Sequence, residues 1–344
     1  MRKILTLMLT LVGAVLLSAC GPSKPVLHVY MWSDYISPDS IAQFEKQFNC
    51  RVIIDTFDSN EMLYAKMKAG GVGYDLLMPS SYMAKLMFEQ KMIVELDKSK
   101  IPNMQYIDKK YLKENALDKQ MRYSMPYMIC YACVAYDPEK TGGPLPETWK
   151  VFDDPKFKGR LTLLNDIREL IGIALKVNGF SFNSTNDAEL QKAKETLLKW
   201  RENVAKFDSE AYKLGIATGE FSVVHGYSGD LAQVVREKPN LKLMFPKEGM
   251  SISCDDWVIP VGAKNPDLAH AFINFMATPE VAVQNMDYSQ YDAVNWKARE
   301  IMPEEMRNMP TMNIPADVME KSEVIMDLGD DNAKYNAIWG ELKL

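Results

Sequence analysis

Residues 27–39 read LHVYMWSDYISPD, an apolar run that continues into a tryptophan, a hydroxyl, an acid and a tyrosine. A helix is expected to follow, with Ser37 as its cap and Pro38 at its first position. Ligands bind beyond the carboxyl ends of the strands in open α/β sheets, so this junction lies where a site is expected. An ordinary strand-to-helix loop is the alternative. The candidate ligand residues are Trp32, Ser33, Asp34 and Tyr35.

Strand and helix patterns alternate outward from this junction. Strands are expected over 26–30, 51–57 and 74–78, and helices over 40–48 and 60–69. Further strands are expected over 128–136, 161–164 and 221–224, and further helices over 166–178, 187–203, 229–236 and 266–276. The alternation in the first part of the chain predicts a parallel sheet with right-handed crossovers, and the later elements predict a second α/β unit.

Two lobes joined by extended crossings leave a cleft between them, where binding sites concentrate. We expect residues 26–128 and 257–300 to form the first lobe, and residues 129–256 and 301–344 to form the second. The 344-residue chain is long enough for two cores, and its 47% hydrophobic, 25% charged composition is that of a soluble globular protein. A net charge of −6 argues against a nucleic-acid partner, which would require lysine and arginine at phosphates.

The N-terminus has the pattern of an export signal. Arg2 and Lys3 precede an apolar run over 4–17 that is too short to span a membrane as a stable helix. The ending Leu-Ser-Ala-Cys20 resembles a bacterial lipobox, which implies removal of residues 1–19, acylation of Cys20 and a tether over 20–25. The alternative is an ordinary secretory signal with an incidental cysteine. We therefore expect a periplasmic or cell-surface protein, anchored to a membrane by lipid.

Cys130 and Cys133 form a C-x-x-C motif inside a strand pattern. Extended residues three apart face opposite sides with Cα atoms ~10 Å apart, which is beyond disulfide reach. Both a thioredoxin-like site and a zinc site are therefore rejected. The expected compartment permits disulfides, and whether Cys50, Cys130, Cys133 and Cys254 pair stays open.

Groups for catalysis are few. Of three histidines, His28 lies in a strand pattern and His270 in an amphipathic helix, so both are interpreted as structural. The stretch around Ser228 approaches a G-x-S-x-G elbow, but its spacing fails. No glycine-rich phosphate loop and no clustered metal-ligand pattern is present. We expect no catalytic residue, no metal and no cofactor, and an exported hydrolase acting through Ser228 is the least favoured alternative.

An acid beside an aromatic residue recurs at the ends of predicted strands. Each group has a structural alternative, such as a capping box at Asp166 and Glu169. Helix N-termini attract anions, so several acids at such junctions reverse the preference and favour a cation, held by carboxylates and aromatic faces. The further candidates are Ser80, Tyr82, Asp166, Glu169, Tyr227, Asp230, Asp255 and Tyr291.

Six motifs, in order along the chain, resemble the bacterial spermidine/putrescine-binding proteins of polyamine ABC importers. They lie at 30–38, 57–62, 74–80, 96–102, 246–249 and 274–279. The resemblance implies a type II periplasmic-binding-protein fold of two lobes, each a mostly parallel sheet flanked by helices. It also implies a monomer that closes on a polyamine in the interlobe cleft and delivers it to a membrane permease.

The resemblance implies that the candidates named above line the ligand, with Glu169 and Asp255 as the principal ammonium partners. Tyr227 and Ser253 stand where the family usually has larger aromatic residues, and Ile325 stands in the place of a glutamine. Asp34 and Asp230 match the putrescine-preferring members, so putrescine is favoured over spermidine. A binding protein for another small solute is the main alternative.

Overall fold

The computed structural model describes residues 24–71 and 73–343. The predicted signal peptide over 1–19, the predicted lipidation site Cys20 and most of the tether over 20–25 lie outside the described residues. Across the described part of the chain, no helix has the length and apolar character needed to cross a membrane.

The first sheet holds three parallel strands in the order β2–β1–β3. They are β1 (Val26–Met31), β2 (Arg51–Thr56) and β3 (Leu76–Leu77). Several helices accompany this sheet. They are α2 (Pro38–Phe48), α3 (Asn60–Lys68), α4 (Ser81–Glu89) and, later in the chain, α11 (Pro266–Met276), α12 (Pro279–Ser289) and α13 (Trp296–Ile301). Helix α2 begins at Pro38 with Ser37 as its cap, as predicted. Apolar spacing predicted α2, α3 and α11 and missed α4, α12 and α13.

The second sheet holds eight strands, with the order β11–β9–β4–β7–β5–β6 and with β8 and β10 paired to β4. They are β4 (Met125–Tyr136), β5 (Leu161–Leu163), β6 (Val204–Phe207), β7 (Val223–Tyr227), β8 (Lys242–Met244), β9 (Ser251–Trp257), β10 (Asp292–Ala293) and β11 (Glu323–Val324). Only β5–β6, β5–β7 and β9–β11 are parallel pairs. This sheet is therefore mixed, which corrects the expectation of a mostly parallel sheet in each lobe. The cause is β4, which runs antiparallel to each of its four partners.

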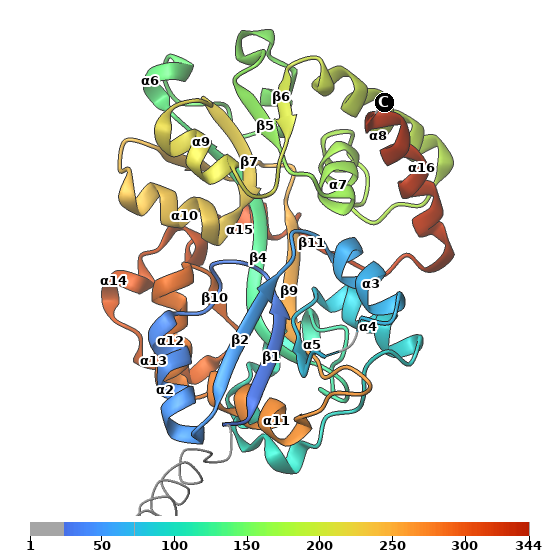
Figure 1. The fold of residues 1–344 in the computed structure, drawn as a ribbon. Helices are drawn as coiled ribbons and strands as arrows, with labels where there is room; N and C mark the ends of the chain where they lie inside the picture. The colour runs from blue at the N-terminus through green and yellow to red at the C-terminus, as the bar shows by residue number, and fades with distance from the viewer. Residues whose placement is uncertain (1–23, 72, 344) are drawn as a thin grey trace, which may run out of the picture.

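The upper half in Figure 1 is completed by helices that flank the second sheet. They are α7 (Ile167–Val177), α8 (Asp187–Arg201), α9 (Tyr212–Thr218), α10 (Ser228–Glu237) and α16 (Asn332–Lys343). The remaining α-helices are α5 (Lys109–Glu114), α6 (Pro138–Thr141), α14 (Glu304–Arg307) and α15 (Ala316–Met319). Short 3-10 helices occupy Lys98–Lys100, Pro102–Tyr106, Trp149–Asp153, Pro155–Phe157, Pro310–Met312 and Gly329–Asp331.

Two long strands, β4 and β9, connect the lower and upper halves side by side (Figure 1). Strand β9 begins at Ser251, in a stretch for which no strand was predicted. The strand was missed because its composition is polar, with Asp255 and Asp256 inside it. The predicted lobe boundaries at 128/129 and 256/257 fall within this pair of strands, and they stay a prediction.

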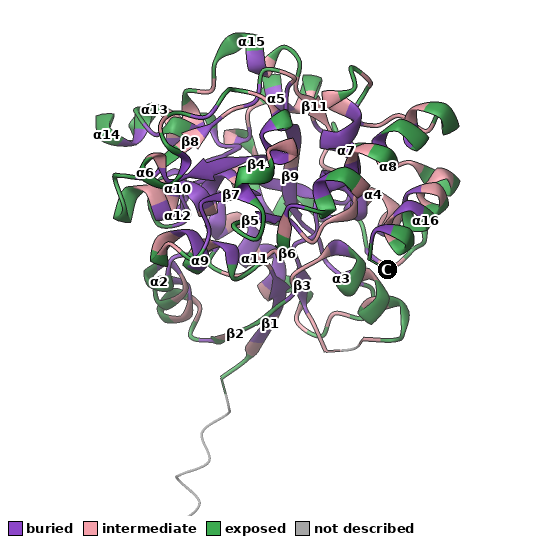
Figure 2. Cartoon of the chain, turned by 90° about the horizontal axis from the view of Figure 1, so that it is seen from above, coloured by how far each residue is buried: buried purple, intermediate pink, exposed green. Residues whose placement is uncertain are grey.

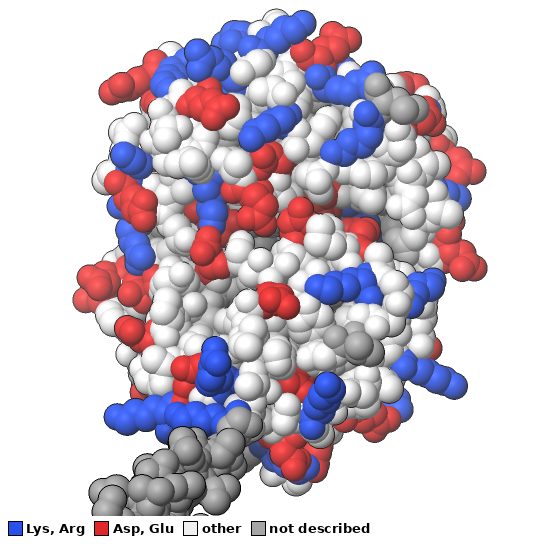
Figure 3. Space-filling model, viewed as in Figure 1, with Lys and Arg blue, Asp and Glu red and all other residues white. Residues whose placement is uncertain are grey.

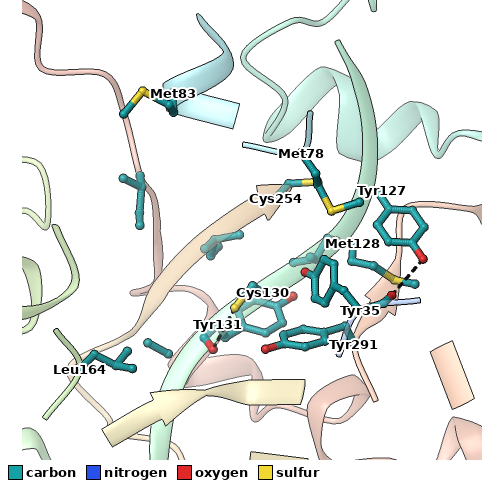
Figure 4. Close-up of a cluster of buried hydrophobic side chains, with 14 of the residues drawn as sticks. Tyr35, Met78, Met83, Tyr127, Met128, Cys130, Tyr131, Leu164, Cys254 and Tyr291 are labelled. Atoms are coloured by element: carbon teal, nitrogen blue, oxygen red, sulfur yellow. Dashed lines mark hydrogen bonds between the residues drawn. The ribbon is translucent and has the colours of Figure 1, made fainter. Parts of the chain in front are cut away.

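Buried residues fill the centre of the molecule, and every residue of β4 is buried (Figure 2). The four cysteines Cys50, Cys130, Cys133 and Cys254 are all buried and free, which answers the question that the sequence left open. Cys130 and Cys133 lie in a continuous strand, as predicted, and Cys130 lies close to the aromatic cluster of Figure 4. Because burial raises the pKa of the Cys130 thiol, it is a weakly reactive packing group.

Candidate ligand-binding cleft

A cavity of about 650 Å³, counting the space at its open mouth, lies between the two halves. Acidic side chains gather at the boundary between the two halves, where the surface in Figure 3 is hollowed. Of the twelve predicted ligand residues, Asp34 lies outside the lining. The eleven that line the cavity are Trp32, Ser33, Tyr35, Ser80, Tyr82, Asp166, Glu169, Tyr227, Asp230, Asp255 and Tyr291.

Asp255 of β9 is held at the cavity by two hydroxyl groups. The Tyr35 hydroxyl donates to Oδ2 at 2.8 Å, and the Ser80 hydroxyl donates to Oδ1 at 2.8 Å. Burial raises the pKa of Asp255 to about 6, although the two hydroxyls oppose the shift. Beside it, the buried Nε1–H of Trp32 has no hydrogen-bond partner among the described residues. The Asp255 carboxylate and the Trp32 N–H donor therefore line the same wall.

The start of α7 brings two further acids into the cavity. Asp166 caps the helix, since its Oδ1 accepts from the backbone N–H groups of Arg168 at 2.8 Å and Glu169 at 3.0 Å. The reciprocal half of a capping box is missing, because Oε2 of Glu169 has no partner among the described residues. Glu169 is only 2% exposed. Burial first, and the charge of Asp166 second, raise its pKa to about 8.

Aromatic rings form the apolar part of the wall. Tyr35 and Tyr291 pack edge to face with centroids 4.8 Å apart, next to Cys130 (Figure 4). The Tyr227 hydroxyl donates to Oδ2 of Asp166 at 3.0 Å, which fixes that ring beside the acid. Gly229 permits the position of Tyr291, since a Cβ there would come within 2.2 Å of the Tyr291 ring. Tyrosine rings and carboxyl groups therefore both line the cavity.

The α9 and α10 flank has a different arrangement. Asp34 adopts a left-handed backbone with φ of +52°, and its carboxylate lies 2.9 Å from the ammonium of Lys213. The same ammonium lies 3.6 Å from Oδ1 of Asp230, whose Oδ2 accepts from the Tyr212 hydroxyl at 2.7 Å. Burial raises the pKa of Asp230, and Lys213 opposes that shift. Asp34 thus pairs with the protein's own cation at the edge of the cleft.

Several lining residues were not predicted. Asn60 lies within the family motif at 57–62, and Arg168 lies within the capping-box pattern, so the sequence contained information that could have indicated both residues. The loop before α9 contains no such motif. Asn60 donates to the Tyr82 hydroxyl at 3.0 Å and to the Ser80 hydroxyl at 3.1 Å, so it positions two predicted residues. The unpredicted lining residues are Asp58, Asn60, Cys130, Arg168, Ser209, Glu210, Ser253 and Ile325, of which the last two were noted only as departures.

The lining is strongly negative. It holds six acids and one base, Arg168. The Arg168 guanidinium is engaged elsewhere, because it donates to the Met326 carbonyl at 2.6 Å and to Oδ1 of Asn183 at 2.9 Å. It also lies over the Tyr82 ring at 5.4 Å. The acids are Asp58, Asp166, Glu169, Glu210, Asp230 and Asp255. Such a cavity favours a cationic guest.

The chemistry of a hydrolase is missing at the suspected position. The Ser228 hydroxyl is buried and accepts from the backbone N–H of Tyr131 at 3.2 Å. Neither ring nitrogen of the buried His225 has a partner in the described part of the chain, and burial lowers its pKa to about 3. His270 is structural as predicted, since its Nε2 accepts from the backbone of Asp97 at 2.9 Å. Across residues 24–71 and 73–343, no cluster of metal-ligating side chains is found.

Two halves joined by paired strands around a polar, aromatic cleft define the class of two-lobed solute-binding proteins. Residues 39–312 match the model of the bacterial extracellular solute-binding protein family, so the chain belongs to that family. It is 34% identical over 94% of its length to the putrescine-binding periplasmic protein SpuD of Pseudomonas aeruginosa, of which 92% is covered. It is 32% identical over 94% of its length to spermidine/putrescine-binding periplasmic protein 1 of Haemophilus influenzae, of which 91% is covered.

Solved structures agree with these relatives. A putative spermidine/putrescine ABC transporter protein from Listeria monocytogenes superposes with a TM-score of 0.88 at 35% identity, covering 93% of this chain and 99% of the other. The TpPotD lipoprotein of Treponema pallidum superposes with a TM-score of 0.82 at 30% identity, covering 92% and 99%. The expected fold class and the family resemblance are confirmed. The first three of these relatives are named as binding or transport proteins, and the fourth is named as a lipoprotein.

Proposed function

We propose that this chain is an extracytoplasmic polyamine receptor that delivers its ligand to an ABC importer. The observation that supports it most strongly is Glu169, a buried acid in a cavity lined by six acids, with one oxygen that has no partner in the described part of the chain. Burying an unpaired charge is costly, so a positively charged guest would stabilise this arrangement. The names of the relatives point to the same ligand class.

In this proposal Glu169 and Asp255 hold the two ends of a diamine. Tyr35, Tyr227 and Tyr291 contact the methylene chain, whose four CH₂ groups contribute ~3 kcal/mol when buried. Each charge-assisted hydrogen bond adds ~1.5 to 3 kcal/mol, from which closure costs are subtracted. A dissociation constant of about 1 μM or tighter is therefore attainable.

We further propose that putrescine binds more tightly than spermidine. Ile325 and Ser253 line the cavity and contribute no charge, so a third ammonium group gains nothing from those positions. An ammonium buried without an acid is costly, and this cost falls on the longer ligand.

The proposal includes a lipid anchor on Cys20, a periplasmic or cell-surface location and a monomeric receptor. One of the relatives in the structural comparison is itself named a lipoprotein. Intact mass spectrometry of protein from bacterial membranes tests the anchor, with an expected start at Cys20 and an added lipid mass. An unmodified N-terminus at another residue would contradict this part.

Titration calorimetry of the purified mature chain tests the ligand class. Putrescine and spermidine should bind, with putrescine the tighter, whereas 1,4-butanediol, which has the same carbon chain without charge, should not. A thermal-shift panel of amino acids, sugars and metal complexes serves as the parallel arm. Stabilisation by one of these compounds, with no response to either polyamine, would favour a receptor for another solute.

A further inference from the structure

A lysine of the chain occupies the space between two of the predicted ligand acids. The Lys213 ammonium lies 2.9 Å from Asp34 Oδ2 and 3.6 Å from Asp230 Oδ1. Its side chain is only 20% exposed, and Asp230 is 15% exposed. Two carboxylates at hydrogen-bonding or near-contact distance are the surroundings that a ligand ammonium would require. Here the protein supplies the cation itself.

The three residues come from both halves of the molecule. Asp34 follows β1 of the lower half, whereas Lys213 lies in α9 and Asp230 in α10 of the upper half (Figure 1). Lys213 therefore forms an ion pair across the mouth of the cleft. Nearby Glu210 adds to the negative charge that faces the ammonium and helps to raise the pKa of Lys213.

A second cation, Arg168, lines the cavity on its other flank. Arg168 belongs to α7, which lies on the opposite side of β7 from α9 in both Figure 1 and Figure 2. Its guanidinium is anchored on Met326 and Asn183. Among the described residues, Asp230 is the one lining acid that forms an ion pair, whereas Asp58, Asp166, Glu169, Glu210 and Asp255 form none.

We infer that Lys213 is a specificity-determining residue, an internal counter-cation that takes the Asp34 and Asp230 pair away from the ligand. This inference rests on the proposed function and deepens it. With Lys213 in place, the carboxylates of Asp34 and Asp230 already hold a cation. A ligand ammonium that reaches this flank has to displace the lysine or lie beside it as a like charge, and this cost falls on the longer polyamine.

The test is Lys213→Met, which keeps an unbranched side chain one atom shorter and removes its charge. Calorimetry on the mature chain should show the spermidine-to-putrescine affinity ratio rising by about tenfold or more, since the freed acids can hold an additional ammonium. The double variant Lys213→Met with Asp230→Asn should return the ratio toward the wild-type value. Lys213→Arg, which keeps the charge, should leave the ratio close to wild type.

Lys247→Met is the matched control, because Lys247 is exposed and pairs with Glu147 away from the cleft. It should change neither affinity. A Lys213→Met protein that binds putrescine with an unchanged ratio would overturn the inference while leaving the proposed function intact. Failure of the wild-type chain to bind any polyamine would instead overturn the proposed function, and the inference with it.

Discussion

Two regions of the cleft carry acidic side chains: the wall around Asp255 and Glu169, and the flank around Asp34 and Asp230. In the described part of the chain, the acids of the flank are paired with a lysine, whereas the acids of the wall form no ion pair. At the wall, the acids meet hydroxyls or no partner, and burial raises the pKa values of Asp255 to about 6 and Glu169 to about 8. At the flank, Lys213 lies within 3.6 Å of both carboxylates. A list of acids is therefore not a list of ligand contacts, because a neighbouring cation decides which charges are available.

The largest effect is expected from Asp255→Asn, which removes the charge from the centre of the wall. Breaking one side of a buried ion pair costs about 3 to 5 kcal/mol, so putrescine affinity should fall by at least about 100-fold. Calorimetry measures it. Asp267→Asn, an exposed aspartate of α11 paired with Lys100, is the control with the same change of charge. Near-wild-type binding by Asp255→Asn would count heavily against the role of this wall.

Acidification should weaken binding next most strongly. A ligand ammonium favours the ionised form of Glu169, so binding below pH 8 expels the proton that the raised pKa retains. Affinity should fall by about tenfold per pH unit as pH drops from 8 to 6, with Asp255 adding to the loss near its pKa of about 6. Calorimetry in buffers of different ionisation enthalpy measures the proton release at pH 7. Equal affinities at pH 8 and pH 6 would show that Glu169 is not a contact.

Glu169→Gln should lower putrescine affinity by about tenfold at pH 7, less than Asp255→Asn. At this pH the free energy needed to remove the proton from Glu169 offsets part of its contribution to the binding free energy, since its pKa is about 8. The variant should also lose most of the pH dependence between 6 and 8. Titrations of wild type and variant at three pH values check both effects, and a variant that keeps the wild-type slope would assign the proton to another group.

The flank should give the smallest effect. Asp34→Asn removes a carboxylate that is 54% exposed and already paired with Lys213, and pairs of this kind contribute up to ~1 kcal/mol. Putrescine affinity should therefore change by less than about fivefold. A loss as large as that for Asp255→Asn would erase the contrast between wall and flank and place a ligand ammonium at Asp34.

Much of this architecture was accessible from local sequence signals. The Ser37-Pro38 start of α2 and the Asp166 cap of α7 are governed by neighbours within three residues, and both appear as predicted. Strand β9 was missed because its acids break the apolar pattern on which strand prediction depends. Its burial comes from β4, which lies more than 100 residues earlier in the chain.

The site shows the same limit. Eleven of the twelve predicted residues line the cavity, and most of them lie at or just after the end of a strand, whereas Asp255 lies inside β9 and Tyr291 precedes β10. Asp34 follows strand β1, but its backbone is left-handed and its side chain points away from the cavity toward Lys213, which lies 179 positions away in the sequence. No local sequence pattern predicts a contact between residues so far apart in the chain. The residues that line a site are thus easier to predict from sequence than the set of charged groups that remains unpaired within it.

The position of Asp255 on β9 has a kinetic consequence. That strand is one of the two connectors between the halves, and Asp255 also bridges to Ser80 of the lower half. A group close to a hinge axis moves least when a two-lobed protein opens, so one amine can dock on Asp255 before the halves meet. Substitutions on α7 and α10 should then lengthen or shorten the residence time of the ligand while leaving its rate of capture nearly constant.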